Sequence, residues 1–211
     1  MISLVILAAG KSTRMEENKL LLKVNGETLI QRVVKTAKRS GVDELVVVLG
    51  YEASKIREQL AKLYCKPVTN ESYIRGQSES VKVGLSAISN NAEAVMILPA
   101  DVALIDAQSI NKVADEYRKS RSRIVVASHL QHSGHPILIS RTLFPEVAAI
   151  DEDTQGLKAV VDRHRAEVKY VEVGTENVLI DIDTKEQFNK YFPMTSHPRV
   201  SASVNSQSVG A

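Results

Sequence analysis

The chain has 211 residues, of which 44% are hydrophobic and 25% are charged, and these values are typical of a globular protein with a sizeable buried core. Its formal net charge of +2 is too small to indicate a nucleic acid or an acidic membrane surface as a partner. A single cysteine, Cys65, excludes an internal disulfide framework and is typical of a reducing compartment. The first apolar run has no basic flank before it and is too short to span a membrane, so we expect a cytoplasmic protein.

The chain opens on a buried-strand pattern followed by a polar, basic loop. Residues 2–9 are apolar apart from Ser3, as in a parallel strand that is buried on both faces. The next ten residues hold Gly10, two hydroxyls and three cations, among them Arg14 and Lys19. Backbone N–H groups, hydroxyls and cations together suit a polyphosphate. The opening therefore predicts a strand that delivers a phosphate-binding loop.

Two better-known phosphate loops do not fit this stretch. A Walker loop requires a second glycine five residues after Gly10, but Met15 stands there. The dinucleotide fingerprint GxGxxG fails at Ser12 and Met15, which disfavours a dinucleotide-binding oxidoreductase.

Apolar runs alternate with helical patterns along the rest of the chain, which predicts a three-layer α/β sheet with right-handed crossovers. Extended segments are expected at residues 45–49, 66–68, 94–98, 124–127, 135–139, 168–173 and 178–182. Helical patterns occupy residues 27–38, 53–63, 81–88, 110–117, 155–164 and 184–191. Because no helix separates residues 124–127 from 135–139, these strands must pair antiparallel or lie apart, so we expect a mixed sheet. We assign residues 1–192 to one domain and expect residues 193–211, which lack acidic residues and periodicity, to be a disordered tail.

Asp101 directly follows the predicted strand at residues 94–98 and its Pro-Ala extension. Its carboxylate is expected at the carboxyl edge of the sheet, where the opening loop also lies. A cap role is the alternative, although Asp106 is the better cap candidate for the next helix. Since Mg²⁺ is typically held by one or two carboxylates plus substrate phosphates, we predict that Asp101 binds magnesium.

A second carboxylate is expected from Asp181 or Asp183, which alternation places on one side of a strand. One of the two is expected to face the metal while the other caps the final helix. Asp183 is favoured for the metal, and the alternative is that Asp183 is the cap, because it directly precedes Thr184 and a helical pattern. Arg14 and Lys19 would neutralise a triphosphate and the departing pyrophosphate. The Ser12 hydroxyl and the Gly10 N–H group are candidate phosphate donors, and Lys11 either assists or is solvated.

Three further groups of residues have simpler interpretations as well as functional ones. Asn70, Gly76, Gln77, Ser78 and Ser80 lead into a helix, which suits a helix cap as well as a binding role. His129, His132 and His135 are spaced three residues apart, and we expect loop and turn roles in preference to a zinc site. Cys65 is interpreted as a core thiol.

The opening loop follows the pattern LAAGxSxRMxxxK, which resembles the signature loop of nucleotidyltransferases built on the nucleotide-diphosphosugar transferase fold. The matching positions are Leu7, Ala8, Ala9, Gly10, Ser12, Arg14, Met15 and Lys19. Further segments resemble the molybdenum cofactor cytidylyltransferases and their relatives that transfer guanylyl groups. These segments are residues 19–22, 70–80, the strand end at Asp101, the Gly-His-Pro of residues 134–136 and the Asp-Ile-Asp-Thr of residues 181–184.

The resemblance implies a magnesium-dependent transfer of CMP from CTP to a molybdopterin-type acceptor, with release of pyrophosphate and a possible transient contact with a molybdoenzyme. Arg14, Lys19 and Asp101 are the implied catalytic residues. Asp101, Asp183 and Asp181 are implied for the metal, and Gln77, Ser80 and His135 for the acceptor substrate. The implied nucleotide-binding residues are Leu7, Ala8, Ala9, Gly10, Ser12, Arg14, Lys19, Asn70, Gly76 and Ser78.

Departures from the family pattern leave other functions open. Glu16 stands where the family usually has glycine, Ala100 and Ala103 replace a glycine and a proline around Asp101, and Lys158 replaces an arginine. Either the acceptor differs or activity is weakened. The alternatives are guanylyl transfer, cytidylyl transfer to an isoprenoid precursor, transfer to a sugar phosphate, and a non-catalytic carrier of nucleotide or cofactor.

Overall fold

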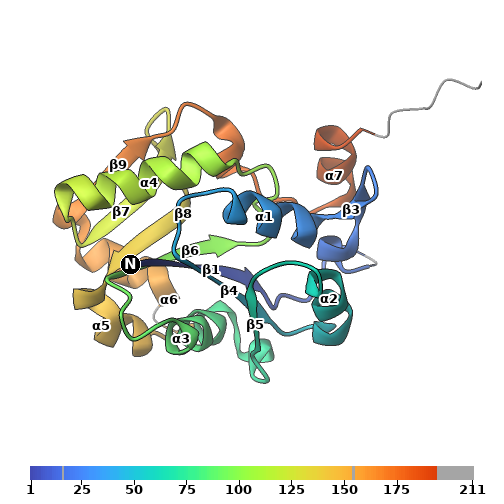
Figure 1. Cartoon of the computed structure of the whole chain (residues 1–211), viewed down its shortest axis with the longest axis horizontal. Helices are drawn as coiled ribbons and strands as arrows, with labels where there is room; N and C mark the ends of the chain where they lie inside the picture. Colours follow the sequence, from blue (N-terminus) through green and yellow to red (C-terminus); the bar gives the residue numbers. More distant parts are fainter. Residues whose placement is uncertain (16, 154, 194–211) are drawn as a thin grey trace, which may run out of the picture.

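The computed structural model describes residues 1–15, 17–153 and 155–193. Within them a seven-stranded sheet runs in the order β5-β4-β1-β6-β8-β7-β9 (Figure 1). The strands are β1 (Ile2–Ala8), β4 (Glu44–Leu49), β5 (Lys66–Thr69), β6 (Ala94–Pro99), β7 (Ile124–His129), β8 (His132–Ser140) and β9 (Val168–Glu172). Only β8 runs antiparallel to its neighbours β6 and β7, so the predicted mixed, mostly parallel sheet is confirmed.

Helices cover both faces of the sheet and make three layers (Figure 1). One face carries α1 (Leu29–Lys38), α2 (Ala53–Leu60), α4 (Ala107–Ser120) and α7 (Lys185–Tyr191). The other carries α3 (Gln77–Ala87), α5 (Phe144–Ala148) and α6 (Gly156–Arg163). Five short 3-10 turns are described, namely η1 (Lys19–Leu21), η2 (Tyr73–Arg75), η3 (Arg141–Leu143), η4 (Arg165–Glu167) and η5 (Glu176–Leu179), together with a hairpin of β2 (Lys23–Val24) and β3 (Glu27–Thr28).

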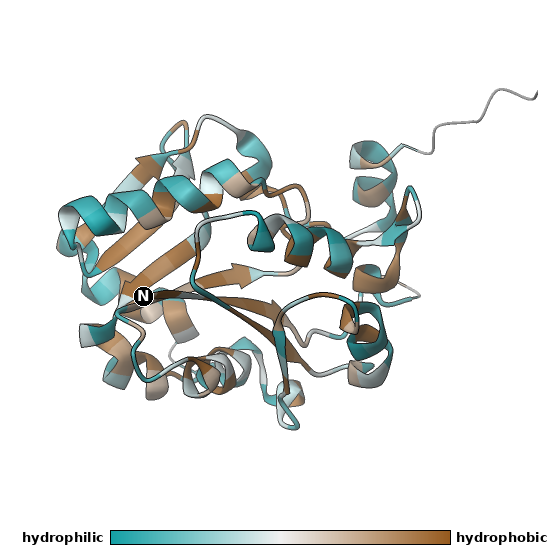
Figure 2. Ribbon diagram, viewed as in Figure 1, coloured by the Kyte–Doolittle hydropathy of each residue, from teal (hydrophilic) through white to brown (hydrophobic). Residues whose placement is uncertain are grey.

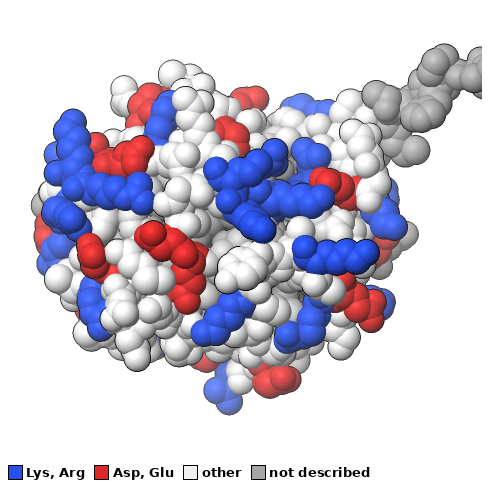
Figure 3. Space-filling view, in the orientation of Figure 1, with Lys and Arg blue, Asp and Glu red and all other residues white. Residues whose placement is uncertain are grey.

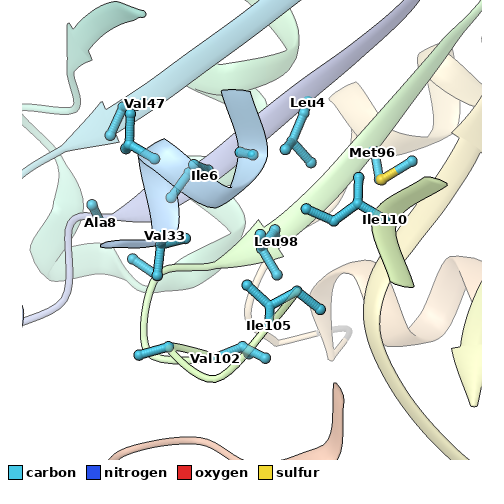
Figure 4. Close-up of a cluster of buried hydrophobic side chains, with 14 of the residues drawn as sticks. Leu4, Ile6, Ala8, Val33, Val47, Met96, Leu98, Val102, Ile105 and Ile110 are labelled. Atoms are coloured by element: carbon cyan, nitrogen blue, oxygen red, sulfur yellow. The ribbon is translucent and has the colours of Figure 1, made fainter. Parts of the chain in front are cut away.

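The central strand β1 is buried along its whole length because both of its faces are covered. Alternate side chains of a strand point to opposite faces, so Leu4 and Ile6 enter one core and Val5 enters the other. Figure 4 shows Leu4 and Ile6 gathered with Met96 and Leu98 of β6, and Figure 2 shows the apolar strands beneath helices whose outer faces are polar. β1 therefore fixes the start of the loop that follows Ala8.

The outer surface of the helices is polar, and the part over α1 is basic. Figure 3 shows basic side chains gathered over α1, whose last turn holds Lys35 and Lys38. Cations at the carboxyl end of a helix interact favourably with its dipole, which gives these lysines a structural role. Among residues 1–15, 17–153 and 155–193, no helix combines the length and apolar character needed to cross a membrane.

Two predictions about local structure were wrong. The segment predicted as a strand at residues 178–182 overlaps the end of η5. Val178 is buried in the core, and Thr175 caps the turn by accepting a hydrogen bond from the Asn177 N–H group at 3.3 Å. The three histidines occupy strands β7 and β8 and not loops, since the connecting turn is formed by Leu130 and Gln131 at φ 47° and 69°.

The remaining predictions concern Cys65, which the structure describes, and the tail, most of which it does not. Cys65 is half-buried at the edge of the core, and burial raises the pKa of its thiol. The predicted tail lies outside the described residues except for Pro193, and so do Glu16 and Thr154.

Gly84 of α3 provides a test of this packing. A Cβ atom there would lie 2.4 Å from Val5 Cγ1 of β1 and 3.1 Å from Val48 Cγ2 of β4. We expect Gly84→Val to lower the free energy of unfolding by about 1–3 kcal/mol, because overpacking between helix and sheet exceeds any gain in helix propensity. Urea titration measures the change, and Ser86→Ala on the exposed face of α3 is the control. A Gly84→Val protein as stable as the parent would contradict the close helix–sheet contact.

Candidate active site

The loop after β1 is closed by its own hydrogen bonds. Ser12 adopts a left-handed conformation at φ 54°, and its carbonyl accepts the Met15 N–H group at 2.9 Å. The Ser12 hydroxyl oxygen accepts the Lys19 N–H group at 3.3 Å. The space beside Gly10 is open, since a Cβ atom there would meet nothing within 4 Å. The loop thus turns back to place Lys19 at the sheet edge and leaves room beside Gly10.

Lys19 lies at the centre of a partly buried ion cluster. Its Nζ is 2.8 Å from Asp101 Oδ2 and 2.7 Å from Asp183 Oδ1, and only 12% of its side chain is exposed. Arg14 Nη1 approaches the other side of Asp183, 2.6 Å from Oδ2, but its own side chain is 71% exposed. The Ile182 N–H group donates to the Asp101 carbonyl at 3.0 Å, which holds the C-terminal segment against the end of β6.

The cluster shifts the pKa values of its members in opposite directions. Burial lowers the pKa of Lys19, but the charges of Asp101 and Asp183 and their hydrogen bonds outweigh burial and give a net rise. The hydrogen bond from Lys19 lowers the pKa of Asp183 against a smaller effect of burial. Partial burial, which removes water from the carboxylate, raises the pKa of Asp181 to about 6. The negative charges of Asp101 and Asp183 add to this rise. Asp181 is still reached by solvent because it lines an open cavity.

The carboxylates suit a divalent cation. Asp101 Oδ1 is buried and has no hydrogen-bond partner among the described residues, and carboxylate oxygens are the donors that Mg²⁺ prefers. No group of three or more His, Cys, Asp or Glu side chains placed to hold a metal ion is found in the described part of the chain, and the Lys19 ammonium contacts both Asp101 and Asp183. Asp101 Oδ1 is the carboxylate oxygen of this pair that neither Lys19 nor Arg14 contacts, so it is the candidate metal ligand.

The residues that cap α4 and α7 agree with one prediction and contradict another. Asp106 caps α4 by accepting the Ser109 N–H group at 2.7 Å, as predicted. The cap of α7 is Thr184, which forms a capping box with Gln187, so the predicted cap role for one of the two aspartates was wrong. Asp183 is thereby left to Lys19 and Arg14.

A cavity of about 260 Å³ lies beside this cluster. The predicted residues in its lining are Leu7, Ala8, Ala9, Gly10, Ser12, Lys19, Gly76, Gln77, Ser80 and Asp101. Sequence reasoning missed Tyr73, which also lines this cavity and whose ring centroid is 5.9 Å from Lys11 Nζ. Nothing in the sequence around Tyr73 distinguished it from a surface tyrosine.

Asn70 lines neither of the two cavities described here. It is buried, donates from Nδ2 to Ser80 Oγ at 3.0 Å, and accepts the Ser72 N–H group at 2.9 Å. Asn70 therefore holds the segment that carries Ser80 in position and does not itself line either cavity.

A larger cavity of about 460 Å³ adjoins the first, and the two share Leu7, Gln77 and Pro99. Its lining includes the predicted Gln77, Ser78, His135 and Asp181. Burial lowers the pKa of His135, and its Nδ1 atom is buried without a hydrogen-bond partner in the described chain. Residues missed from the sequence are Glu152, Gln155, Asp162 and Tyr170, whereas Lys158 was noticed only as a departure from a family pattern.

The sequence matches the MobA-like NTP transferase domain over residues 4–168. It is 30% identical to the purine catabolism protein PucB of Bacillus subtilis over 193 residues, covering 88% of this chain and 93% of PucB. It is 33% identical over 127 residues to the bifunctional protein GlmU of Desulfotalea psychrophila, a match that spans 59% of this chain but only 37% of GlmU.

Solved structures share the fold of this chain. The crystal structure of Rv0371c from Mycobacterium tuberculosis H37Rv superposes with a TM-score of 0.80 at 28% identity, covering 90% of this chain and 97% of Rv0371c. A structure of Rv0371c in complex with manganese has a TM-score of 0.75 at 26% identity and covers 92% of this chain and 99% of that one.

The raised pKa of Asp181 predicts that the stability of the protein depends on pH. A carboxyl whose pKa is higher in the folded than in the unfolded protein binds its proton more tightly when folded, so its ionisation opposes folding. Stability is therefore lost as the pH rises from 3.8, the ordinary value, through about 6. We expect Asp181→Asn to raise the melting temperature at about pH 7.5 and to leave it unchanged at about pH 4. Asp153→Asn, which removes an exposed carboxylate outside the ion cluster, is the control. An equal effect of Asp181→Asn at both pH values would contradict the predicted coupling.

Proposed function

Because the chain belongs to the family of MobA-like NTP transferase domains, which are nucleotidyltransferases, we propose that it transfers CMP from CTP to a molybdopterin-type cofactor and releases pyrophosphate. The observation that carries this proposal is the contact of the Lys19 ammonium with both Asp101 and Asp183 beside the smaller cavity. Cations and carboxylates at one point suit a metal-bound triphosphate better than an uncharged ligand.

The smaller cavity is assigned to the nucleotide. Its wall contains the open space beside Gly10 and the Lys19 side chain, so a triphosphate bound there meets backbone N–H groups and a fixed positive charge. Arg14 is exposed and, within the described residues, is held by Asp183 alone, so its guanidinium can reach the outer phosphates. We assign Arg14 and Lys19 the role of balancing charge as pyrophosphate departs.

The metal role is assigned to Asp101 and Asp183, with Asp181 beside them. Asp101 Oδ1, which has no hydrogen-bond partner in the described part of the chain, supports this assignment, and the manganese complex of Rv0371c supports the use of a divalent ion. When bound, Mg²⁺ supplies positive charge to the triphosphate and polarises its α-phosphate. Lys19 keeps the carboxylates in position by contacting one oxygen of each.

The larger cavity is assigned to the acceptor, because it meets the nucleotide cavity at Leu7, Gln77 and Pro99. There a terminal phosphate oxygen of the acceptor forms a bond to the α-phosphorus of CTP. The bond from that phosphorus to the bridging oxygen breaks, and pyrophosphate leaves with the electron pair. Catalysis then rests on positioning and charge, and no protein nucleophile is required.

The molybdopterin acceptor is supported by the sequence resemblance of the segments around Asp101 and His135, and such an enzyme would pass its product to a molybdoenzyme. A sugar phosphate acceptor is an alternative that keeps the same fold and the same reaction. A non-catalytic carrier is the alternative from another class, and it differs by binding ligand without releasing pyrophosphate.

The test is pyrophosphate release from CTP and, separately, from GTP, with Mg²⁺ and molybdopterin supplied. We expect release with CTP that depends on the cofactor. Asp101→Asn and Lys19→Ala should each reduce the rate by about 100-fold or more, since each removes a charge from the reacting centre.

Asp115→Asn and Lys62→Ala change the same residue types on the outer surface and serve as matched controls. Undiminished release from Asp101→Asn would remove that residue from the mechanism. Binding of CTP without any release would favour the carrier, and release with GTP alone would assign the other base.

A further inference from the structure

The amino end of α3 lies where the two cavities meet. Gln77, its first residue, lines both cavities, whereas Ser78 lines the larger and Ser80 the smaller. The preceding Gly76 offers no side chain to cap the helix. The first-turn N–H groups of a helix and its dipole favour an anion at this end.

A carboxylate from a distant part of the chain occupies this position. Glu152 Oε1 accepts the Ser78 N–H group at 2.5 Å, across 74 residues of sequence. Two glycines allow the approach. A Cβ atom on Gly76 would lie 2.3 Å from Glu152 Cγ, and one on Gly156 would lie 2.7 Å from Ser78 Oγ. The segment that carries Glu152 is therefore seated closely on the first turn of α3.

A second feature of the larger cavity indicates that a ligand belongs there. His135 lines the same cavity as Ser78 and Glu152, and its buried Nδ1 atom has no hydrogen-bond partner among the described residues. Buried polar atoms in native proteins are normally satisfied, and a turn of the His135 ring, which lines the cavity, would bring this atom within reach of a bound molecule. Glu152 is exposed, so its carboxylate can move into solvent without crossing the core.

We propose that the amino end of α3 is a phosphate subsite of the acceptor cavity, and that Glu152 occupies it in the free protein and competes with the acceptor phosphate. A phosphate oxygen replaces the Glu152 carboxylate at the Ser78 N–H group, because two anions cannot share that donor without strong repulsion. This inference rests on the proposed function in assigning the larger cavity to a phosphorylated acceptor.

The test measures binding and needs no turnover. The nucleotide cavity is first saturated with a non-hydrolysable CTP analogue, and the dissociation constant of inorganic phosphate, then of phenyl phosphate, is measured by calorimetry. Glu152→Gln and Glu152→Ala should bind both probes about tenfold more tightly than the parent, the size expected when one like charge is removed at short range.

Asp153→Asn is the matched control, since it removes one charge from the neighbouring residue, which lines neither cavity. We expect it to change phosphate binding by less than about twofold. Glu152→Gln binding that equals that of Asp153→Asn, or that is weaker than the parent, would overturn the proposal. Melting temperatures verify that each variant is folded.

The outcome is separable from that of the proposed function. A Glu152 effect without pyrophosphate release in the turnover assay would retain the phosphate subsite and reject the reaction. Release without a Glu152 effect would retain the reaction and reject the subsite. Failure of both probes to bind any variant at millimolar concentration would also reject the subsite.

Discussion

The contact of one lysine ammonium with two carboxylates links three distant parts of the chain at one edge of the sheet. Lys19 follows the first strand, Asp101 follows β6, and Asp183 precedes the last helix. β1 and β6 are hydrogen-bonded neighbours and parallel, so their carboxyl ends and the segments after them must lie together. Without Lys19, Asp101 and Asp183 would repel one another and the C-terminal segment would lose an anchor.

The ion cluster borders two binding spaces, since Lys19 and Asp101 line the smaller cavity and the nearby Asp181 lines the larger. On the side of the opening loop the smaller cavity is bounded by Gly10, Ser12 and Lys19. On the other side the larger cavity extends over β8 and α6, and its lining combines apolar side chains such as Val126 and Ile137 with polar ones such as His135 and Asp162. A reaction that joins two phosphorylated molecules requires such adjacent spaces with charged groups close to both. The protein thus supplies position and charge, which is what nucleotidyl transfer requires.

The part of the site that could be predicted from sequence is the part held by local pattern. The apolar runs before Gly10 and before Asp101 predicted strands β1 and β6. Because these strands are adjacent and parallel, the residues that follow them lie together. The positions of Glu152 and Tyr73 depend on contacts across many residues, and no periodicity encodes such contacts. Residues 178–182 were wrongly predicted as a strand because Val178, Ile180 and Ile182 stand at alternate positions, as on one face of a strand. Their side chains pack against the core, but the segment pairs with no strand of the described sheet. Thr184 and not an aspartate caps α7, since its hydroxyl is placed to complete a capping box with Gln187.

The most direct test of the account is the dissociation constant of CTP measured with and without Mg²⁺, in the parent protein and in Asp101→Asn. The account predicts that Mg²⁺ tightens CTP binding by about tenfold or more in the parent and that Asp101→Asn abolishes this gain, because Asp101 holds the ion against the triphosphate. Asp115→Asn should retain the gain in full. An equal effect of Mg²⁺ on the parent and on Asp101→Asn would contradict the assignment of this edge of the sheet to a metal-bound nucleotide.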